Sequence, residues 1–531
     1  MVDLKLRTQF VPIDNTICTK TAFPVRMAVL RMIRTHRIMR WRHFEGSVKT
    51  GPNFTAEAAE AEIERLSCGS KKVVWNSPTR QTFEFDLPAT VYPPREDTSL
   101  LAGALHRLGL PHGSSCLEIG CGSGAVSIHA ATLGWRVVAC DINPFSVACT
   151  RHHASLYGQT ITVLEGGPGP LMDGFSAQWG GDRRYDVVMW NLPYLPRPDE
   201  GEEVLGPMEE SALIDTDDKG LFVRYVNRIS KGQLLKENGI ALAVVSSLLD
   251  GANACSIAWR NGLAARVIAT ENFEDGEALF LVGMWTPYAN SQKLHESVVE
   301  STNTVLLEGS HSAGARCTAD RQLLGRGRRG RSWESFEGGI AVSWVIDDGT
   351  RELHKPADQV HLGFNMLQLF QHYDSQRICL KWPNDIYIRS SLKSPWKKCA
   401  GILFEGRTRG KGQRTVLGIG LNQTQPKRPE FSGLDELSTE LGGCEIVGQL
   451  HAIIASMFEF CQQPHIPFSN PQIDNVNEAL VFGAKQLGPV FYRGSKVDIL
   501  GIDADGHLNV LDAKGTPIKV KEPEDLEWSN I

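Results

Sequence analysis

LEIGCGSG, at residues 117–124, decides the fold of the first half of this 531-residue chain. It ends an apolar run and precedes AVSIHAATLG at residues 125–134, which has a helical pattern. A strand, a glycine turn and a helix in this order bring backbone N–H groups against a nucleotide-like ligand. Further apolar, β-rich runs alternate with helical stretches as far as residue 284. This alternation predicts an α/β fold with a doubly wound, Rossmann-like, mostly parallel sheet.

The second half has a different pattern. From residue 294 strands and helices follow with a new spacing, which indicates a second domain. Near the C-terminus, short alternating runs are separated by the turns RGS, DADG and AKG, which predicts the hairpins of a small barrel. The expected segments are an N-terminal extension with a basic helix (1–88), the α/β domain (89–286), a linker (287–293), the α+β domain (294–487) and the barrel (488–531).

Composition limits the possible partners. The net charge is −6 and the pI about 6.2, so the chain offers no general attraction to nucleic acid, and we regard nucleic acid as an improbable partner. We expect no membrane helix, because no apolar run reaches spanning length. The twelve cysteines are scattered without a CxxC pair, which favours reduced thiols and a cytoplasmic location.

Asp141 and residues 191–196 suggest the chemistry of the first half. Asp141 ends the run VVACD, where a carboxylate can accept hydrogen bonds from ribose hydroxyls, although Asp141 could instead cap the next helix. These features alone leave a nucleotide-dependent dehydrogenase possible. NLPYLP, at residues 191–196, follows the strand-like run DVVMW. Asn191 can hold a planar amide or amine while the Tyr194 ring lies against it, which favours methylation of an amino group.

These motifs resemble the class I S-adenosylmethionine-dependent methyltransferases, and within them the NPPY group that methylates release-factor glutamine or related nitrogens. The resemblance covers about residues 90 to 285 and includes VYPPREDTSLLAGAL at residues 91–105. It implies S-adenosylmethionine as the cofactor and a translation release factor as a partner. The residues implied for cofactor binding are Glu118, Gly120, Gly122, Gly124 and Asp141, and those for the target nitrogen are Asn191, as the catalytic group, with Leu192, Pro193 and Tyr194.

Two departures from that family leave alternatives open. Leu192 replaces the first proline of the motif, and residues 165–175 lack the acidic residue usually found where the adenine amino group is read. An inactive half that serves as a binding module is one alternative. The other is an RNA base N6 methylase, since such enzymes share an Asn-x-Pro-aromatic motif.

Three motifs of the second half indicate phosphate chemistry. GRGRRGR (residues 325–331), KWPND (381–385) and KCAGIL (398–403) follow one another in this order. Glycines allow the backbone to approach a ligand, and arginines grip planar anions. Lys381 can neutralise a triphosphate, and Asp385 can hold Mg²⁺. A nucleic-acid patch is the alternative for the basic loop, but it does not explain the apolar surroundings of KWPND.

Together these motifs resemble biotin protein ligase from about residue 294 to the C-terminus, including an SH3-like terminal barrel. The resemblance implies biotin, ATP and Mg²⁺ as ligands and the carrier domain of a biotin-dependent carboxylase as partner. Lys398, Arg328 and Lys381 would be catalytic, and Asp385 the metal ligand; Lys397 competes with Lys398 for its role. A lipoate-type ligase is the alternative. The substrate-binding residues implied are Ser301, Thr302, Asn303, Gln322, Gly325, Arg326, Gly327, Arg328 and Gly401.

Overall fold

The computed structural model describes the greater part of the chain. It covers residues 69–529, without 169–178, 181–182, 197–211, 216, 218, 250, 349–354, 410–411 and 444. The basic helix predicted within the N-terminal extension, and most of the segment 165–175, lie outside the described residues. Among the described helices, none is long and apolar enough to cross a membrane.

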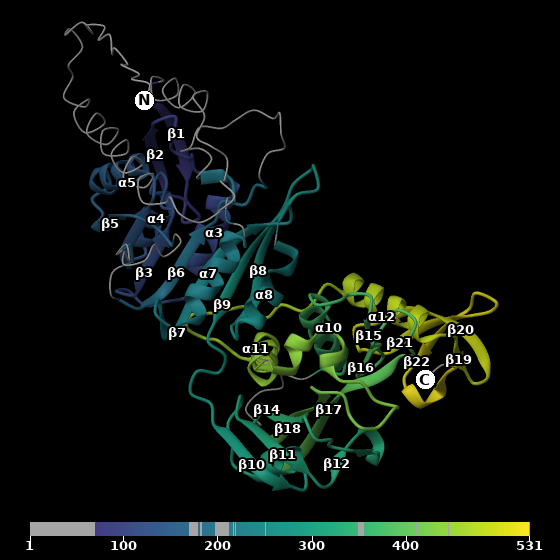
Figure 1. The fold of residues 1–531 in the computed structure, drawn as a ribbon. Helices are drawn as coiled ribbons and strands as arrows, with labels where there is room; N and C mark the ends of the chain where they lie inside the picture. The colour runs from purple at the N-terminus through teal and green to yellow at the C-terminus, as the bar shows by residue number, and fades with distance from the viewer. Residues whose placement is uncertain are drawn as a thin grey trace, which may run out of the picture.

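A mixed sheet forms the centre of the first half (Figure 1). Its described strands lie in the order β5 (Ile161–Glu165), β4 (Arg136–Asp141), β3 (Ser115–Ile119), β6 (Tyr185–Asn191), β7 (Leu235–Ser246), β9 (Ala278–Trp285) and β8 (Ala264–Asn272). The strands from β5 to β7 are parallel, and β9 and β8 are antiparallel. The helices packed on it are α3 (Glu96–Arg107), α4 (Ala125–Thr132), α5 (Pro144–Leu156), α7 (Leu221–Ser230) and α8 (Ala254–Arg260). The predicted α/β class of this half is therefore confirmed.

A hairpin that sequence analysis did not predict precedes this sheet. It consists of β1 (Lys71–Asn76) and β2 (Thr82–Leu87), which pair antiparallel. The buried rings of Trp75, Phe83 and Phe85 pack against apolar side chains of α3, α4 and α5. The hairpin is thus part of the core of the first half, although it lies in the segment assigned to the extension.

A second sheet carries the motifs of the second half. Its described strands lie in the order β10 (Lys293–Val299), β11 (Arg316–Gln322), β14 (Gly339–Asp347), β18 (Gly412–Asn422), β17 (Lys397–Arg409), β16 (Asp385–Ile388) and β15 (Ile378–Lys381). β10 and β11 are parallel, and the other neighbours pair antiparallel. The described helices are α9 (Thr302–Glu308), α10 (Asp358–Gln371), α11 (Ile446–Phe458) and α12 (Ile473–Leu487). This arrangement is the predicted α+β architecture.

A small antiparallel sheet ends the chain (Figure 1). In sheet order its described strands are β22 (Pro517–Val520), β21 (Leu508–Asp512), β20 (Ser495–Ile502), β19 (Val490–Tyr492) and β23 (Leu526–Trp528). The predicted hairpins are present, because β19 to β22 follow one another through tight turns. Trp382 donates a hydrogen bond to the carbonyl of Gly506 at 3.0 Å, which ties this sheet to the one before it.

The two halves meet in a buried interface. Helix α11 of the second half packs against β8 and α8 of the first half. The side chain of Arg266, in β8, is 1% exposed, and its guanidinium donates to the carbonyls of Ser456 at 2.6 Å, Glu459 at 2.6 Å and Ile466 at 3.1 Å. The guanidinium also lies 4.4 Å from the centre of the Phe468 ring. An arginine of one half therefore caps the last turn of a helix of the other.

The segment between the halves takes part in this interface. The backbone N–H of Tyr288, within the predicted linker, donates to Glu459 at 3.0 Å, and Trp285 Nε1 donates to the same carboxylate at 2.7 Å. Burial raises the pKa of Glu459. The Tyr288 ring packs on the imidazole of His451, with centroids 5.5 Å apart. The connection is thus a packed element and not a free tether.

Candidate active sites

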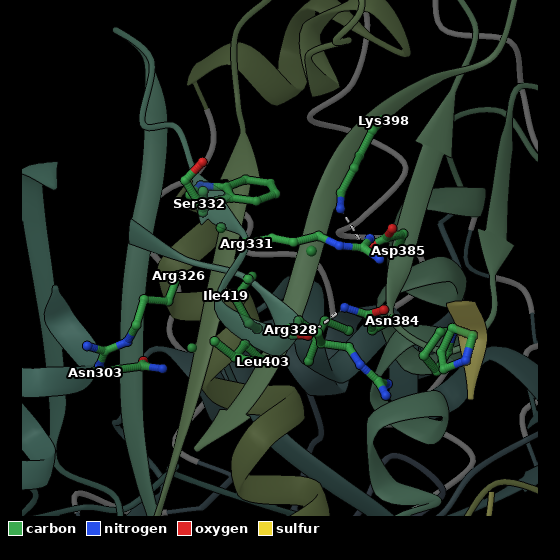
Figure 2. A pocket seen from close by; sticks show the side chains of 18 of the residues that line it. Asn303, Arg326, Arg328, Arg331, Ser332, Asn384, Asp385, Lys398, Leu403 and Ile419 are labelled. Atoms are coloured by element: carbon green, nitrogen blue, oxygen red, sulfur yellow. Dashed lines mark hydrogen bonds and ion pairs between the residues drawn. The ribbon is translucent and has the colours of Figure 1, made fainter. Parts of the chain in front are cut away.

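A cavity of about 360 Å³ lies beside the second sheet, and Figure 2 shows side chains that line it. Its lining includes Trp528 of the terminal sheet and Glu524 of the turn before β23. Gly325 does not line it but pairs with Trp333 in the short strands β12 (Gly325–Arg326) and β13 (Ser332–Trp333). The predicted site residues that line this cavity are Ser301, Thr302, Asn303, Gln322, Arg326, Gly327, Arg328, Lys381, Asp385, Lys398 and Gly401.

One end of this cavity is a network of polar groups whose buried members are neutral. The Thr302 backbone N–H donates to Gln322 Oε1 at 2.8 Å, and its hydroxyl lies 2.6 Å from that of Ser343. Ser343 donates to Asn303 Oδ1, and Asn303 Nδ2 donates to Glu405. Thr302, Asn303 and Ser343 are buried. Such a network can both donate to and accept from a small neutral polar group. Sequence analysis gave no role to Ser343, which lies within the largely apolar strand β14, or to Glu405 of β17.

The other end of the cavity is basic. Lys398 Nζ forms an ion pair with Asp385 Oδ1 at 2.8 Å and lies 5.4 Å from the Trp333 ring centre (Figure 2). Lys381 Nζ lies 5.3 Å from the ring centre of Trp528. Burial lowers the pKa of Lys381, whereas the nearby Asp385 carboxylate opposes this shift. A phosphate here would likewise favour the charged form of Lys381 and be held by two ammonium groups.

Lys397 and Lys398 occupy different positions. Both belong to β17, where successive side chains point to opposite faces of a sheet. Lys398 lines the cavity, whereas Lys397, opposite Ile388 in β16, is not among its lining residues. The geometry therefore favours Lys398 for the role that sequence analysis left open between the two.

Arg326 and Arg328 are held by different partners. Arg326 Nε lies 3.0 Å from Glu405, the carboxylate that also binds Asn303. Arg328 Nη1 lies 3.5 Å from Gln359 Oε1. Arg326 thus reaches the polar network around Asn303, whereas Arg328 contacts a side chain of α10.

Arg329 and Arg331 are paired with carboxylates of the turn that precedes β23. Arg331 Nη2 lies 3.2 Å from Glu524, and Arg329 forms ion pairs with Glu522 and Glu524. Arg331 and Glu524 both line the cavity. The Arg331 guanidinium, which now pairs with Glu524, could therefore bind an anionic ligand in the cavity instead.

A second cavity, of about 410 Å³, lies at the carboxyl ends of the strands of the first sheet. Gly120, Gly122 and Asp141 line it. The Asp141 carboxylate accepts from the backbone N–H of Gly122 at 2.9 Å and of Asn143 at 2.8 Å. Burial raises the pKa of Asp141 to about 6. The cap of α5 is Asn143, whose side chain accepts from Phe145, so the capping alternative for Asp141 is wrong.

Glu118 and Gly124 lie behind the lining residues. Gly124 begins α4 with φ 86°, and a Cβ there would come within 3.0 Å of Thr150, so glycine is required at the turn. The Glu118 carboxyl accepts from Ser127 and is buried, and this burial raises its pKa to about 8. Neither residue is among those that line the cavity. We therefore expect both to shape the turn.

Asn191 and Pro193 line the same cavity, whereas Leu192 and Tyr194 are not among its lining residues. Asn191 Nδ2 donates to Asp97 at 3.0 Å, and Asn191 Oδ1 is buried without a hydrogen-bond partner among the described residues. The Tyr194 hydroxyl also donates to Asp97, at 3.2 Å. Asp97 lies within the quoted motif VYPPREDT, but sequence analysis gave it no role.

An acidic residue reaches this cavity from a later segment. Asp217 and Arg224 form an ion pair, and both line the cavity near Gly166 and Gly167. Sequence analysis found no acidic residue in the segment 165–175 at the place where the adenine amino group is usually read, and Asp217, about fifty residues further along the chain, lines this cavity.

Comparison with known proteins gives matches to both halves. The Biotin/lipoate A/B protein ligase family matches residues 295–422. The bifunctional ligase/repressor BirA of Escherichia coli is 33% identical over 232 residues, which are 39% of this chain and 68% of that protein. The solved biotin protein ligase from Aquifex aeolicus, in complex with biotin and ATP, has 24% identity and a TM-score of 0.34, and the match covers 45% of this chain and 99% of that one.

The first half matches a different group. A candidate protein N5-glutamine methyltransferase of Methanocaldococcus jannaschii is 31% identical over 159 residues, 30% of this chain and 73% of that protein. The release factor glutamine methyltransferase of Geobacter sulfurreducens is 31% identical over 151 residues, 27% of this chain, and the match spans 49% of the relative's length. The chain therefore belongs through its second half to the biotin protein ligase family. Its first half resembles the release-factor glutamine methyltransferases.

Proposed function

We propose that the second half attaches biotin to a lysine of a carboxyl carrier domain at the expense of ATP. One observation carries this proposal: motifs separated by up to a hundred residues line a single cavity with a neutral end and a basic end. The neutral network around Thr302 and Asn303 suits the uncharged head group of biotin. The basic end, with Lys381 and Lys398, suits its carboxylate and the phosphates of ATP.

The chemistry follows from this arrangement. A biotin carboxylate oxygen attacks the α-phosphorus, the bond to the β-phosphate breaks, and pyrophosphate leaves with its electron pair. Lys398 and Lys381 neutralise the charge that develops on the phosphate oxygens. The acceptor amine then attacks the mixed anhydride, forms the amide, loses a proton and releases AMP. Residues 326–328 close over the adenylate and keep water from it.

Asp385 is the residue that would hold Mg²⁺. It fits the ion, because its carboxylate lines the cavity beside the basic end and oxygen is the ligand atom that Mg²⁺ prefers. We assign residues 294–487 to the catalytic domain and 488–531 to an SH3-like barrel that supplies one wall of the cavity.

The test is biotin-dependent exchange of labelled pyrophosphate into ATP, followed by transfer of labelled biotin to a purified carrier domain. Lys398→Met should reduce exchange by about a hundred-fold or more, since a developing charge loses its nearest cation. Lys397→Met is the matched control and should remain active. Exchange that responds to lipoate and not to biotin would replace this proposal with the lipoate-type alternative.

We further propose that the first half transfers a methyl group from S-adenosylmethionine to an amide or amino nitrogen of a protein. Asn191 Oδ1 carries this proposal, because it is buried, has no partner among the described residues and belongs to a residue that lines the cavity with Asp141. Asp141 would accept from the ribose hydroxyls, and Asn191 would hold the target nitrogen in line with the methyl group.

Calorimetry with S-adenosylmethionine and incubation of the protein with methyl-labelled cofactor and a cell lysate test this function. Label in protein supports the proposal. Label in RNA would favour the base methylase alternative, and cofactor binding without transfer to either pool would favour the binding module.

A further inference from the structure

We propose that Asp97 is a positioning residue that fixes the orientation of the Asn191 amide and thereby restricts the methyl acceptor to a nitrogen that carries hydrogen. The proposal rests on the methyltransferase function proposed above. It goes further, because it assigns a role to a residue outside the NLPYLP motif and derives a chemical limit on the acceptor.

The contacts of Asp97 determine the orientation. Asp97 lies in the first turn of α3 and is 2% exposed. Its Oδ2 atom accepts from Asn191 Nδ2 at 3.0 Å, the Tyr92 hydroxyl at 3.1 Å and the Tyr194 hydroxyl at 3.2 Å. A carboxylate can only accept hydrogen bonds, so the NH₂ group of Asn191 must face Asp97. Asn191 Oδ1 must then face the other way.

The carboxylate itself is held in place. Its Oδ1 atom accepts from the backbone N–H and the hydroxyl of Thr98, at 2.5 and 3.1 Å. The positive end of the α3 dipole favours a negative charge in the first turn. Asp97 also links α3 to the end of β6, which are 94 residues apart in sequence. The orientation of Asn191 is therefore fixed by tertiary structure before a substrate arrives.

This orientation limits the substrate. Asn191 Nδ2 gives an N–H to Asp97, and Asn191 Oδ1 has no partner among the described residues, so this oxygen is the group left to receive an N–H from the methyl acceptor. A primary amide or amine can donate one N–H to Asn191 Oδ1 while its lone pair forms the new N–C bond. As the S–C bond breaks, its electron pair stays on sulfur, and the nitrogen then loses a proton to water. A nitrogen without hydrogen would instead place a carbon substituent against Asn191 Oδ1 and leave this buried acceptor unpaired. The acceptor class is thus a nitrogen with at least one N–H.

The first experiment is an exchange of the two polar groups. Asn191→Asp alone places two carboxylates against each other, and Asp97→Asn alone allows either orientation of the Asn191 amide, so each should lower kcat about ten-fold or more. The double variant, Asp97→Asn with Asn191→Asp, restores one donor against one acceptor and keeps an acceptor facing the cavity. It should recover kcat at least about ten-fold over Asn191→Asp. The KM for S-adenosylmethionine should hardly change.

The probes are a peptide with an internal glutamine and the same peptide with dimethyllysine in its place, whose tertiary amine is nucleophilic but carries no hydrogen when neutral and should accept no methyl group. Asp186→Asn is the control, because Asp186 lies at the other end of β6 and pairs with Lys236 at 2.7 Å. It should alter stability without altering kcat. Wild-type kcat in Asp97→Asn, or a double variant no better than Asn191→Asp, would overturn the proposal.

A second measurement does not depend on turnover. In protein labelled with ¹⁵N at asparagine, the side-chain NH₂ of Asn191 should exchange slowly with solvent, and Asp97→Asn should accelerate this exchange. Rapid exchange in the wild-type protein would refute the role of Asp97 even if methylation occurs. Slow exchange without methyl transfer to any protein or peptide would refute the proposed function and leave the orientation intact.

Discussion

Replacing Arg266 with methionine should weaken the interface between the two halves. Methionine has a similar length and no charge, so it keeps most of the buried volume. The substitution removes the guanidinium that donates to the carbonyls of Ser456, Glu459 and Ile466. These carbonyls belong to the end of α11 and the segment after it, where the helix itself offers no N–H.

The size of the effect can be estimated from these contacts. The Ala455 carbonyl also receives a bond from Arg266, but it keeps the backbone N–H of Glu459 as a second donor. An unpaired buried carbonyl costs about 1 to 3 kcal/mol, although water can reach some of those left behind. The variant also loses the contacts that the Arg266 guanidinium makes with the Trp285 and Phe468 rings. Against this, the variant no longer has to bury a charge. The free energy of unfolding should therefore fall by about 3 to 5 kcal/mol.

Urea unfolding and hydrogen exchange measure this effect. Arg266→Met should lower the urea midpoint and increase exchange in β8 and α8. Arg377→Met is a matched control, because Arg377 also donates to main-chain carbonyls, those of Glu436 and Leu437, but within the second half. It should destabilise the second half without increasing exchange in β8. A loss below about 1 kcal/mol in Arg266→Met, or equal exchange in β8 for both variants, would refute the reasoning.

Three further predictions concern substitutions at one or two side chains. Asp141→Ala should weaken S-adenosylmethionine binding in calorimetry by about ten-fold or more, because the ribose hydroxyls lose their acceptor; unchanged affinity would remove Asp141 from the cofactor site. Glu522→Gln with Glu524→Gln should lower the KM for ATP in pyrophosphate exchange by up to about five-fold, because these carboxylates no longer compete for Arg329 and Arg331; a higher KM would mean that the pairs organise the site. Burial lowers the pKa of His451 to about 3, so the unfolded state binds more protons between about pH 6.5 and 3 and stability falls by up to about 1.4 kcal/mol per pH unit as the pH drops through this range; His451→Asn, which can still accept from Trp344 Nε1, should flatten this dependence, and an unchanged slope would contradict it.

Periodicity and glycine positions were sufficient to predict the two sheets and the terminal hairpins. The glycines of residues 117–124 predicted a turn between a strand and a helix. In the structure Gly122 and Gly124 adopt positive φ angles that other residues avoid, which is why the turn needs glycine. The β1–β2 hairpin escaped prediction although TFEFDL alternates apolar and polar residues. Its function as a cover for α3 to α5 depends on contacts with residues far along the chain, which local patterns do not contain.

For the candidate sites, motif spacing identified most of the lining residues but not their partners. Asp97, Ser343 and Glu405 contribute one polar group each, and none stands in a local pattern that marks it. Their importance comes from the network in which they are buried. The interface between the two halves could not be predicted for the same reason. Arg266 is an ordinary basic residue in the sequence, and its role depends on a helix about 190 residues away.

The interface has a consequence for the ligase that does not depend on methyl transfer. β14 carries Ser343 at the neutral end of the ligase cavity, and the next residue, Trp344, donates to His451 of α11. The same helix receives Arg266 and the Trp259 indole N–H from the first half. Helix α11 thus lies between the ligase sheet and the first half and is held from both sides. Because packed interiors transmit displacement, a first half that catalysed nothing would still help to hold the strand that forms the floor of the ligase site.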